Sequence, residues 1–451
     1  MKQSHAWTRR AALAAYALLG SLLPGCSSDI CEGISQSCLS VRLEAGSDQS
    51  SDRLRVLVGI DGSVPVERVS KPPGGTTGAA SFPITFSVLL GDRGGRVDLD
   101  VIAELAGSPR LRAQGGDTVP AGQHKRLTLN LSSDIGNAAT LSSGIPAARH
   151  SAGLAYFPER RSLIMFGGID AGTKPLDDTW EFLAAEKRWQ PLRGLNHPSA
   201  RAGQLAYHAR RRAIALFGGQ APDGSSKSLD DLWVLDQTGA WSSINQPTAP
   251  SPRSGSALAY DRRTDTLVLY GGRNASQPQP LSDVWELVGD SSTWAPRTLS
   301  TAAPVVANPR MVFDGRYVLL IGSDEANPTT LKVWRLDTIF TELPPPGGNT
   351  APIRRNDFAV SFDLSNSALL LFGGTTAGAP LAEALTWSPI DYRWTPLTTA
   401  ATPAARSAAA MAYAPELNGS LLVAGKAADG SPLSGDDNWQ FSAGAWNSLK
   451  P

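Results

Sequence analysis

The chain has 451 residues, with 41 basic and 41 acidic side chains, 44 glycines, 33 prolines and three cysteines. This length suffices for two or three domains with a large buried core. The balanced charge gives no field of one sign, which excludes an ordinary nucleic-acid binder.

The chain begins with the pattern of an export signal. Basic residues precede the apolar run Ala11 to Leu23, which is too short to span a bilayer as a permanent helix. The next motif, Leu23-Pro24-Gly25-Cys26, resembles the lipobox of bacterial lipoproteins, although Pro24 departs from the usual residue. The resemblance implies a signal peptide over residues 1–25 and a lipid on Cys26.

Residues 26–38 are predicted to form a lipidated tether to the membrane. Ser27 stands where aspartate would retain a lipoprotein at the inner membrane, so the resemblance implies an exported protein at the outer membrane, facing the periplasm or the cell surface. With Cys26 lipidated, Cys31 and Cys38 remain, and an oxidising compartment favours a disulfide between them. Two free thiols are the alternative.

Residues 39–133 contain short apolar runs separated by glycine, proline and serine. Val97 to Val101 and Leu127 to Leu131 alternate strictly between apolar and polar residues, as half-buried strands do. We expect an immunoglobulin-like or fibronectin-like β-sandwich that serves as a spacer. Residues 134–145 are interpreted as a linker.

An apolar run closed by glycine returns six times from residue 146 onward. The residue before the glycine is at 166, 217, 270, 321, 372 and 424, which gives steps of 51, 53, 51, 51 and 52. Each unit contains four strand-like pieces, the pattern of a β-propeller blade. We therefore predict that residues 146–451 form a six-bladed propeller, with each blade made from one contiguous segment. The seam between blades one and six is expected to be held by side-chain packing alone and to be covered in part by the sandwich or the linker.

The repeats resemble the kelch repeat. In the first unit the resemblance is carried by Arg149, Phe166-Gly167-Gly168, Asp178, Trp180 and Trp189. The fourth unit departs most, because Ser323 replaces the second glycine and Lys332 replaces the acid before the first tryptophan. The resemblance implies an all-β protein in which the propeller binds other molecules.

One arginine before each inner strand forms the first candidate site. These residues are Arg149, Arg201, Arg253, Arg310, Arg355 and Arg406. They are expected to surround one mouth of the central channel, where they either bind an anion or form ion pairs with nearby acids. Arg310 lacks an acid in its own unit and is expected to contribute most to binding.

Arginines in the turns between first and second strands form a candidate basic face. They are Arg160, Arg161, Arg210, Arg211, Arg212, Arg262 and Arg263. This face would attract an anionic glycan, lipid headgroups or an acidic protein. The alternative is a set of solvated turns, because acidic residues are interleaved with the arginines.

The residue types do not indicate a cofactor, a metal or a catalytic group. Propeller residues 146–451 contain no cysteine, which excludes the copper-radical oxidase chemistry of some kelch propellers. His197 and His208 lack the spacing of a metal site or a triad. We predict a monomeric, non-catalytic scaffold for an envelope protein or an anionic glycan. A kelch-type sugar epimerase or mutarotase and a purely structural envelope protein remain alternatives.

Overall fold

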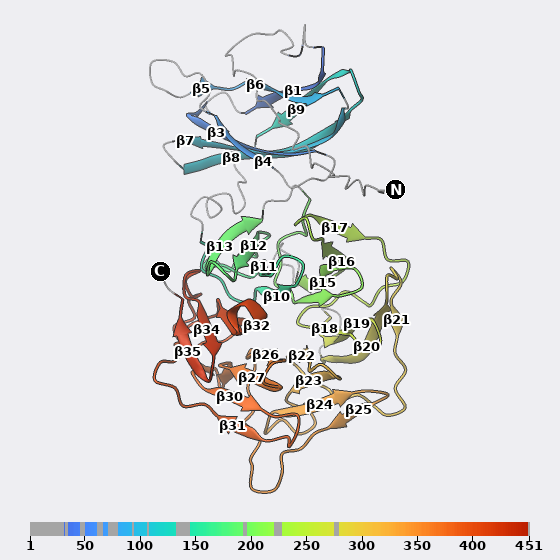
Figure 1. Ribbon diagram of the computed structural model, residues 1–451, viewed down its shortest axis with the longest axis vertical. Coiled ribbons are helices and arrows are strands. Elements are labelled where there is room, and N and C mark those ends of the chain that lie inside the picture. Colours follow the sequence, from blue (N-terminus) through green and yellow to red (C-terminus); the bar gives the residue numbers. More distant parts are fainter. Residues whose placement is uncertain are drawn as a thin grey trace, which may run out of the picture. The chain divides into compact units, whose positions relative to one another are not determined.

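The computed structural model describes most of the chain. It covers residues 31, 35–45, 50–60, 66–70, 80–92, 94–105, 108–131, 145–192, 196–220, 228–274 and 279–449. Regular structure in these residues is β, apart from one 3-10 helix at Pro415–Leu417 (Figure 1). The prediction of an all-β protein is confirmed. The described residues include no helix with the length and apolarity needed to cross a bilayer.

The chain divides into two compact units, residues 1–138 and 139–451. The division falls within residues 134–145, which were predicted to be a linker and lie largely outside the described part. Residues 1–30, including the predicted signal peptide and Cys26, also lie outside it.

The N-terminal unit contains two larger sheets that share one core. One sheet has the order β6-β1-β9 and the other β4-β3-β7-β8, and a short pair joins β2 to β5. The strands are β1 (Ser37–Glu44), β2 (Ser50–Ser51), β3 (Arg53–Ile60), β4 (Val66–Ser70), β5 (Ala80–Ser81), β6 (Ile84–Gly91), β7 (Gly95–Leu105), β8 (Ser108–Val119) and β9 (His124–Asn130). Val97, Leu99 and Val101 on one face of β7 are fully buried in this core, as their alternation predicts.

The described residues of the C-terminal unit form six successive four-stranded antiparallel sheets, which we number one to six. Sheets one to three comprise β10 (Gly153–Phe157), β11 (Ser162–Phe166), β12 (Thr179–Leu183) and β13 (Arg188–Leu192); β14 (Leu205–His208), β15 (Ala213–Gln220), β16 (Ser228–Leu235) and β17 (Trp241–Ile244); and β18 (Ala257–Asp261), β19 (Thr266–Gly272), β20 (Leu281–Val288) and β21 (Ala295–Pro296). Sheets four to six comprise β22 (Arg310–Phe313), β23 (Val318–Gly322), β24 (Lys332–Leu336) and β25 (Phe340–Glu342); β26 (Ala359–Asp363), β27 (Ala368–Phe372), β30 (Ala384–Trp387) and β31 (Trp394–Pro396); and β32 (Ala410–Ala414), β33 (Gly419–Val423), β34 (Trp439–Ser442) and β35 (Ala445–Ser448). A short hairpin of β28 (Thr375–Thr376) and β29 (Ala379–Pro380) accompanies the fifth sheet.

The six sheets are arranged in a ring (Figure 1). Their first strands lie innermost, and β32 of the last sheet contacts β10 of the first. Leu154 and Leu163 of sheet one share a core with Leu421 and Val423 of sheet six. The seam also contains backbone hydrogen bonds, because Ser151 N donates to Ala408 O (2.8 Å). The prediction that side-chain packing alone holds this seam was therefore wrong.

The second strand of each sheet is apolar because both of its faces are covered. In β11 every residue from Ser162 to Phe166 is buried. The following Gly167 has a φ of +65°, and a Cβ there would lie 2.3 Å from the backbone oxygen of Arg201. Glycine is thus required by conformation and by close backbone approach.

The sixth sheet shifts this alignment by one residue. Val423 pairs with Ala410 as Phe166 pairs with Gly153. Ala424 therefore corresponds to the first glycine, with a φ of +58°. The sequence alignment had placed Ala424 one position earlier, because it used the only glycine in that turn as its marker.

Candidate functional site

Five of the six arginines predicted at a channel mouth are buried inside their own sheets. Their exposed fractions lie between 0 and 2%. Each is paired with a carboxylate that precedes the tryptophan of the third strand: Arg149 with Asp178, Arg201 with Asp231, Arg253 with Asp283, Arg355 with Glu383 and Arg406 with Asp437.

The first pair shows what this arrangement does. Arg149 Nη1 and Nη2 donate to the two carboxylate oxygens of Asp178 at 2.6 and 2.7 Å. Nη1 also donates to Gly167 O (2.9 Å), and Trp180 Nε1 donates to Asp178 Oδ2 (2.7 Å). The pair therefore fastens the glycine turn to the third strand through charge-assisted hydrogen bonds.

These five arginines present no free surface to a ligand. The structure gives them the ion-pair role that the sequence left open, and not a place at an anion-binding mouth. Burial acts to lower the pKa of Arg406, against the attraction of Asp437, and that pKa lies below its ordinary value. The cost of burying the cation is offset only while the carboxylate remains ionised.

Arg310 is not equivalent to the other five. In the antiparallel pairing of the first and second strands, Arg310 lies opposite Ile321. The corresponding position in other sheets is occupied by Gly153, Ala257, Ala359 and Ala410. The inclusion of Arg310 in the ring of arginines is corrected accordingly.

The fourth sheet instead lacks the buried pair. An isolated β-bridge joins Val306 to Asp324. The equivalent bridge in sheet three joins Arg273 to Ser254, the residue after Arg253. Val305 therefore stands in the arginine position, and Lys332 stands in the carboxylate position. Both charges of the pair are lost together in this sheet, which avoids leaving one of them buried alone.

Arg310 lines a central cavity of about 1010 Å³ that is bounded by the first strands of all six sheets. Its Nε donates to Phe358 O and its Nη1 to Pro309 O, both at 3.1 Å, and the guanidinium lies 5.8 Å from the centre of the Phe358 ring. None of the described carboxylates forms an ion pair with it. Burial lowers the pKa of Arg310, opposed by the attraction of Asp357.

The predicted basic face consists largely of ion pairs between consecutive sheets. Arg161 of sheet one pairs with Glu416 of sheet six (2.9 Å), and Arg212 of sheet two pairs with Glu159 of sheet one (3.0 Å). Further contacts between consecutive sheets join Arg160 to Gln237 O, Arg210 to Asp290, Arg211 to Asp290 O and Ser291 O, and Arg263 to Asp337. Two ion pairs lie within one sheet, Arg160 with Glu181 and Arg263 with Asp261. Arg262 lies over the Tyr207 ring. Five of these seven arginines thus have a carboxylate partner, which favours the alternative of turns with interleaved acids over a basic docking face.

Tyrosines at the same end of the cavity form a feature that the sequence did not reveal. Tyr207 Oη donates to Glu159 (2.8 Å), and Tyr260 Oη donates to Asp265. Burial, followed by the hydrogen bond to Glu159, raises the pKa of Tyr207 to about 12. The partner of Tyr207 lies 48 residues away in another sheet, so only the ring arrangement brings the two together.

The histidines of the C-terminal unit are dispersed. His208 is fully buried and its ring lies tilted against the Tyr260 ring, with centres 4.8 Å apart. His197 contacts Pro198 O through Nδ1 (2.9 Å), and His150 contacts Ser151 Oγ (3.0 Å). The described residues contain no cluster of three metal-binding side chains.

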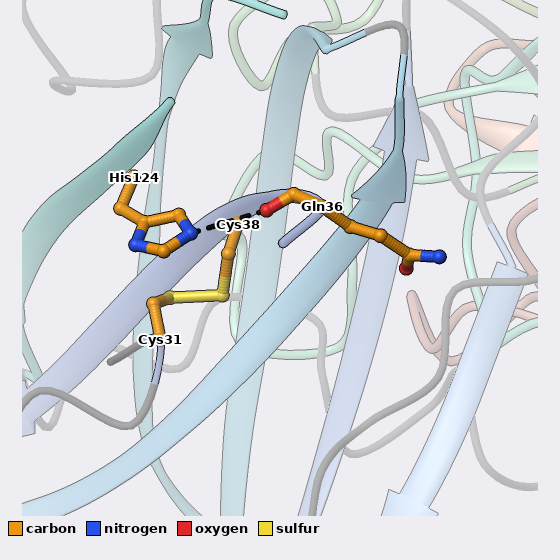
Figure 2. Close-up of a disulfide and its surroundings, with 4 residues drawn as sticks. All are labelled: Cys31, Gln36, Cys38 and His124. Carbon is orange, nitrogen blue, oxygen red and sulfur yellow. Dashed lines mark hydrogen bonds between the residues drawn. A yellow bond between two sulfur atoms is a disulfide. The ribbon is translucent and has the colours of Figure 1, made fainter. Parts of the chain in front are cut away.

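The cysteine pair lies in the N-terminal unit. Cys31 and Cys38 form a disulfide with both residues fully buried (Figure 2). Nearby, the His124 ring contacts Gln36 O at 3.2 Å. Cys26 lies outside the described residues.

Comparison with known proteins identifies kelch repeats in the chain. A family model described as the KLHDC2/KLHL20/DRC7 Kelch-repeats domain matches residues 110–322. Host cell factor 1 of Homo sapiens is 29% identical over 241 residues, which cover 44% of this chain and 11% of that protein. Adagio protein 3 of Arabidopsis thaliana is 27% identical over 234 residues, covering 48% of this chain and 37% of that protein.

A third relative is the flagellar outer arm dynein alpha chain of Chlamydomonas reinhardtii, 29% identical over 253 residues, or 51% of this chain and 5% of that protein. The chain thus spans a small part to just over a third of the length of these relatives. The predicted resemblance of the chain to the kelch repeat is confirmed by the family match.

Proposed function

We propose that the C-terminal unit is a six-bladed kelch-type propeller that binds a protein or a glycan without catalysis. Kelch-repeat domains are typical of protein-binding scaffolds, and the repeats of this chain are similar to those of host cell factor 1 and Adagio protein 3. We further propose that the N-terminal unit is a β-sandwich spacer and that the molecule is an exported monomer.

One observation carries the binding proposal. The residues two positions after the first-glycine position are Ile169, Gln220, Arg273, Asp324, Thr375 and Lys426. They occupy matching positions at one edge of the ring, are at least partly exposed, and differ from sheet to sheet in size and charge. A repeated framework with non-repeated residues at one edge suits specific recognition.

The binding test uses the mature chain in its native envelope. A photocrosslinking residue replaces Arg273 or Lys426 at the variable edge, and Arg161 at the opposite edge as a matched control. We expect a discrete adduct from the two variable-edge positions and none from the control. Equal adducts at all three positions, or at none, would refute recognition by this edge.

A catalytic role is tested separately with an array of sugars followed by NMR. We expect binding without change of the sugar. Exchange of anomers or epimers would replace the scaffold proposal by the enzymatic alternative.

We also propose attachment to the outer membrane through lipid on Cys26. The support is the sequence Leu23-Pro24-Gly25-Cys26 followed by Ser27. Metabolic labelling with a radioactive fatty acid should label the wild type and a Cys31→Ser control and leave Cys26→Ser unlabelled. Label retained on Cys26→Ser, or an inner-membrane location of the labelled protein, would contradict the proposal.

A further inference from the structure

Among the charged residues that line the central cavity, two of opposite sign lie in neighbouring sheets; the others are Arg262, Asp265 and Arg273. Arg310 begins β22 of sheet four, and Asp357 lies two residues before β26 of sheet five. Each is only partly exposed, and the two do not form an ion pair with each other. Arg310 Nε donates to the backbone oxygen of Phe358, the residue after Asp357, at 3.1 Å, so the two charged residues lie close to each other.

Both side chains retain free hydrogen-bonding capacity. Arg310 uses Nε and Nη1 for backbone oxygens, and its Nη2 donates to none of the described residues. In the same part of the chain, no group donates a hydrogen bond to the Asp357 carboxylate. Neither side chain has a fully buried polar atom without a partner, so the uncommitted atoms are accessible and can accept or donate hydrogen bonds to a ligand.

Neither charge is needed by the repeated framework. The position of Arg310 is held by Gly153, Ala257, Ala359 and Ala410 in other sheets. The position of Asp357, two residues after the buried arginine, is held by Ser151, Gly255 and Ala408. The two charged residues thus replace small neutral ones in adjacent sheets.

The backbone at Asp357 follows the repeated framework. Its φ is +53°, and the equivalent Ser151, Gly255 and Ala408 have φ values of +57°, +64° and +52°. Ala408 N donates to Asp357 O at 2.7 Å, as Ser151 N donates to Ala408 O at 2.8 Å. The backbone therefore fixes the position of residue 357, and only the carboxylate is particular to this sheet.

The sign of the charges selects the ligand. A simple anion is attracted by Arg310 and repelled by Asp357. A simple cation is attracted by Asp357 and repelled by Arg310. A compact molecule that carries both charges satisfies both residues. We propose that the central cavity binds a small zwitterion of the α-amino-acid class, with its carboxylate on Arg310 and its ammonium group on Asp357.

The cavity also offers space for the rest of a ligand. Its walls include apolar Met311, Ala409 and Ala410, and a cavity of this size is typical of small-molecule sites. Gln220 and Arg273 of the variable edge line the same cavity. The two proposals are distinguished by their residues, because zwitterion binding depends on Arg310 and Asp357, whereas capture of a partner is tested at Arg273 and Lys426.

The test is calorimetric titration of the mature protein with each of the twenty common L-amino acids, and with propionate and propylamine as probes that carry one charge each. We expect at least one amino acid to bind, and both single-charge probes to bind about 10-fold more weakly or worse. Equal binding of propionate would show an anion site, and no binding of any amino acid at millimolar concentration would show no zwitterion site; both overturn the proposal.

Variants separate a binding role from a structural one. Arg310→Ala introduces the residue found at this position in three other sheets, so its melting temperature should equal or exceed that of the wild type while affinity falls about 10-fold or more. Asp357→Asn should also lose about 10-fold. Arg316→Ala, at an exposed turn of the same sheet, should retain full affinity. Unchanged affinity in Arg310→Ala, or a lowered melting temperature with unchanged affinity, would overturn the proposal.

Discussion

The ion pair of the third sheet provides a sharp test of how the ring is held together. Arg253 is completely buried, whereas the Asp283 side chain is 40% exposed. Two hydrogen bonds join them at 2.7 and 2.9 Å, and Arg253 also donates to Gly271 O (3.0 Å). Replacing Asp283 by asparagine leaves a buried cation without its counter-charge.

Removal of one partner of a buried pair costs about 3 to 5 kcal/mol. Because Asp283 is partly hydrated, we expect Asp283→Asn to lower the free energy of unfolding by about 2 to 3 kcal/mol. Arg253→Met should cost about 3 kcal/mol, since it removes the hydrogen bond to Gly271 O and leaves the partly hydrated Asp283 carboxylate with Trp285 Nε1 as its side-chain donor. The double variant should cost about 2 kcal/mol less than the sum, because it leaves neither charge alone.

The assay is urea unfolding of the mature chain followed by tryptophan fluorescence. The control is Asp290→Asn, whose pair with Arg210 is 62% and 60% exposed and should contribute less than about 1 kcal/mol. If Asp283→Asn cost no more than this control, or if the two single effects simply added, the account of the buried pairs would be refuted.

The same pair predicts a pH dependence. Burial acts to raise the pKa of Asp283, but hydrogen bonds from Arg253 and Trp285 outweigh it, and the pKa lies below its ordinary value. The stabilisation is therefore present above the pKa of an unfolded aspartate and is lost as the pH falls through the lower folded value. Asp283→Asn should lose this acid-range dependence, measured as the urea midpoint against pH.

Three further predictions concern a buried histidine, a left-handed alanine and the disulfide. Burial lowers the pKa of His208 to about 4. The free energy of unfolding should therefore be highest above the unfolded pKa of about 6.5, and should fall by about 2 kcal/mol from pH 8 to pH 5 as the unfolded state gains a proton. A His208→Phe variant that kept the whole loss would contradict this cause. Ala424→Gly should raise the free energy of unfolding by about 0.5 to 1 kcal/mol in urea, because it relieves a left-handed alanine, and a destabilised variant would disprove the assigned alignment. Replacing Cys31 and Cys38 together by serine should cost the N-terminal unit about 2.5 kcal/mol, measured by thermal unfolding with and without reductant; a reductant-insensitive wild type would argue against the bond.

The sequence predicts the repeated part of the molecule well, because that part is local. The apolar run Leu163 to Phe166 and the step from Asp178 to Trp180 each lie within one sheet, and their period near 50 residues indicates like units. The recurring arginine and acid could be proposed as partners for the same reason. The choice between an ion pair and a ligand site required their burial, which spacing does not give.

What the sequence could not give are contacts between sheets and shifts in register. Arg161 meets Glu416 across 255 residues, so its turn could be interpreted as freely basic. Arg310 was grouped with the buried arginines by residue type, although its pairing with Ile321 places it on the cavity wall. Ala424 was misaligned because alanine rarely takes the glycine conformation.

The most direct test of the account compares Arg310→Ala with Arg253→Met in one calorimetric experiment that records amino-acid affinity and melting temperature. Arg253 stabilises the fold through its buried ion pair, whereas Arg310 is proposed to bind the ligand. We predict that Arg253→Met lowers the melting temperature and keeps its affinity below the transition, whereas Arg310→Ala keeps its melting temperature and loses affinity about 10-fold or more. Parallel losses of both properties in both variants, or affinity that survives in Arg310→Ala, would contradict this account.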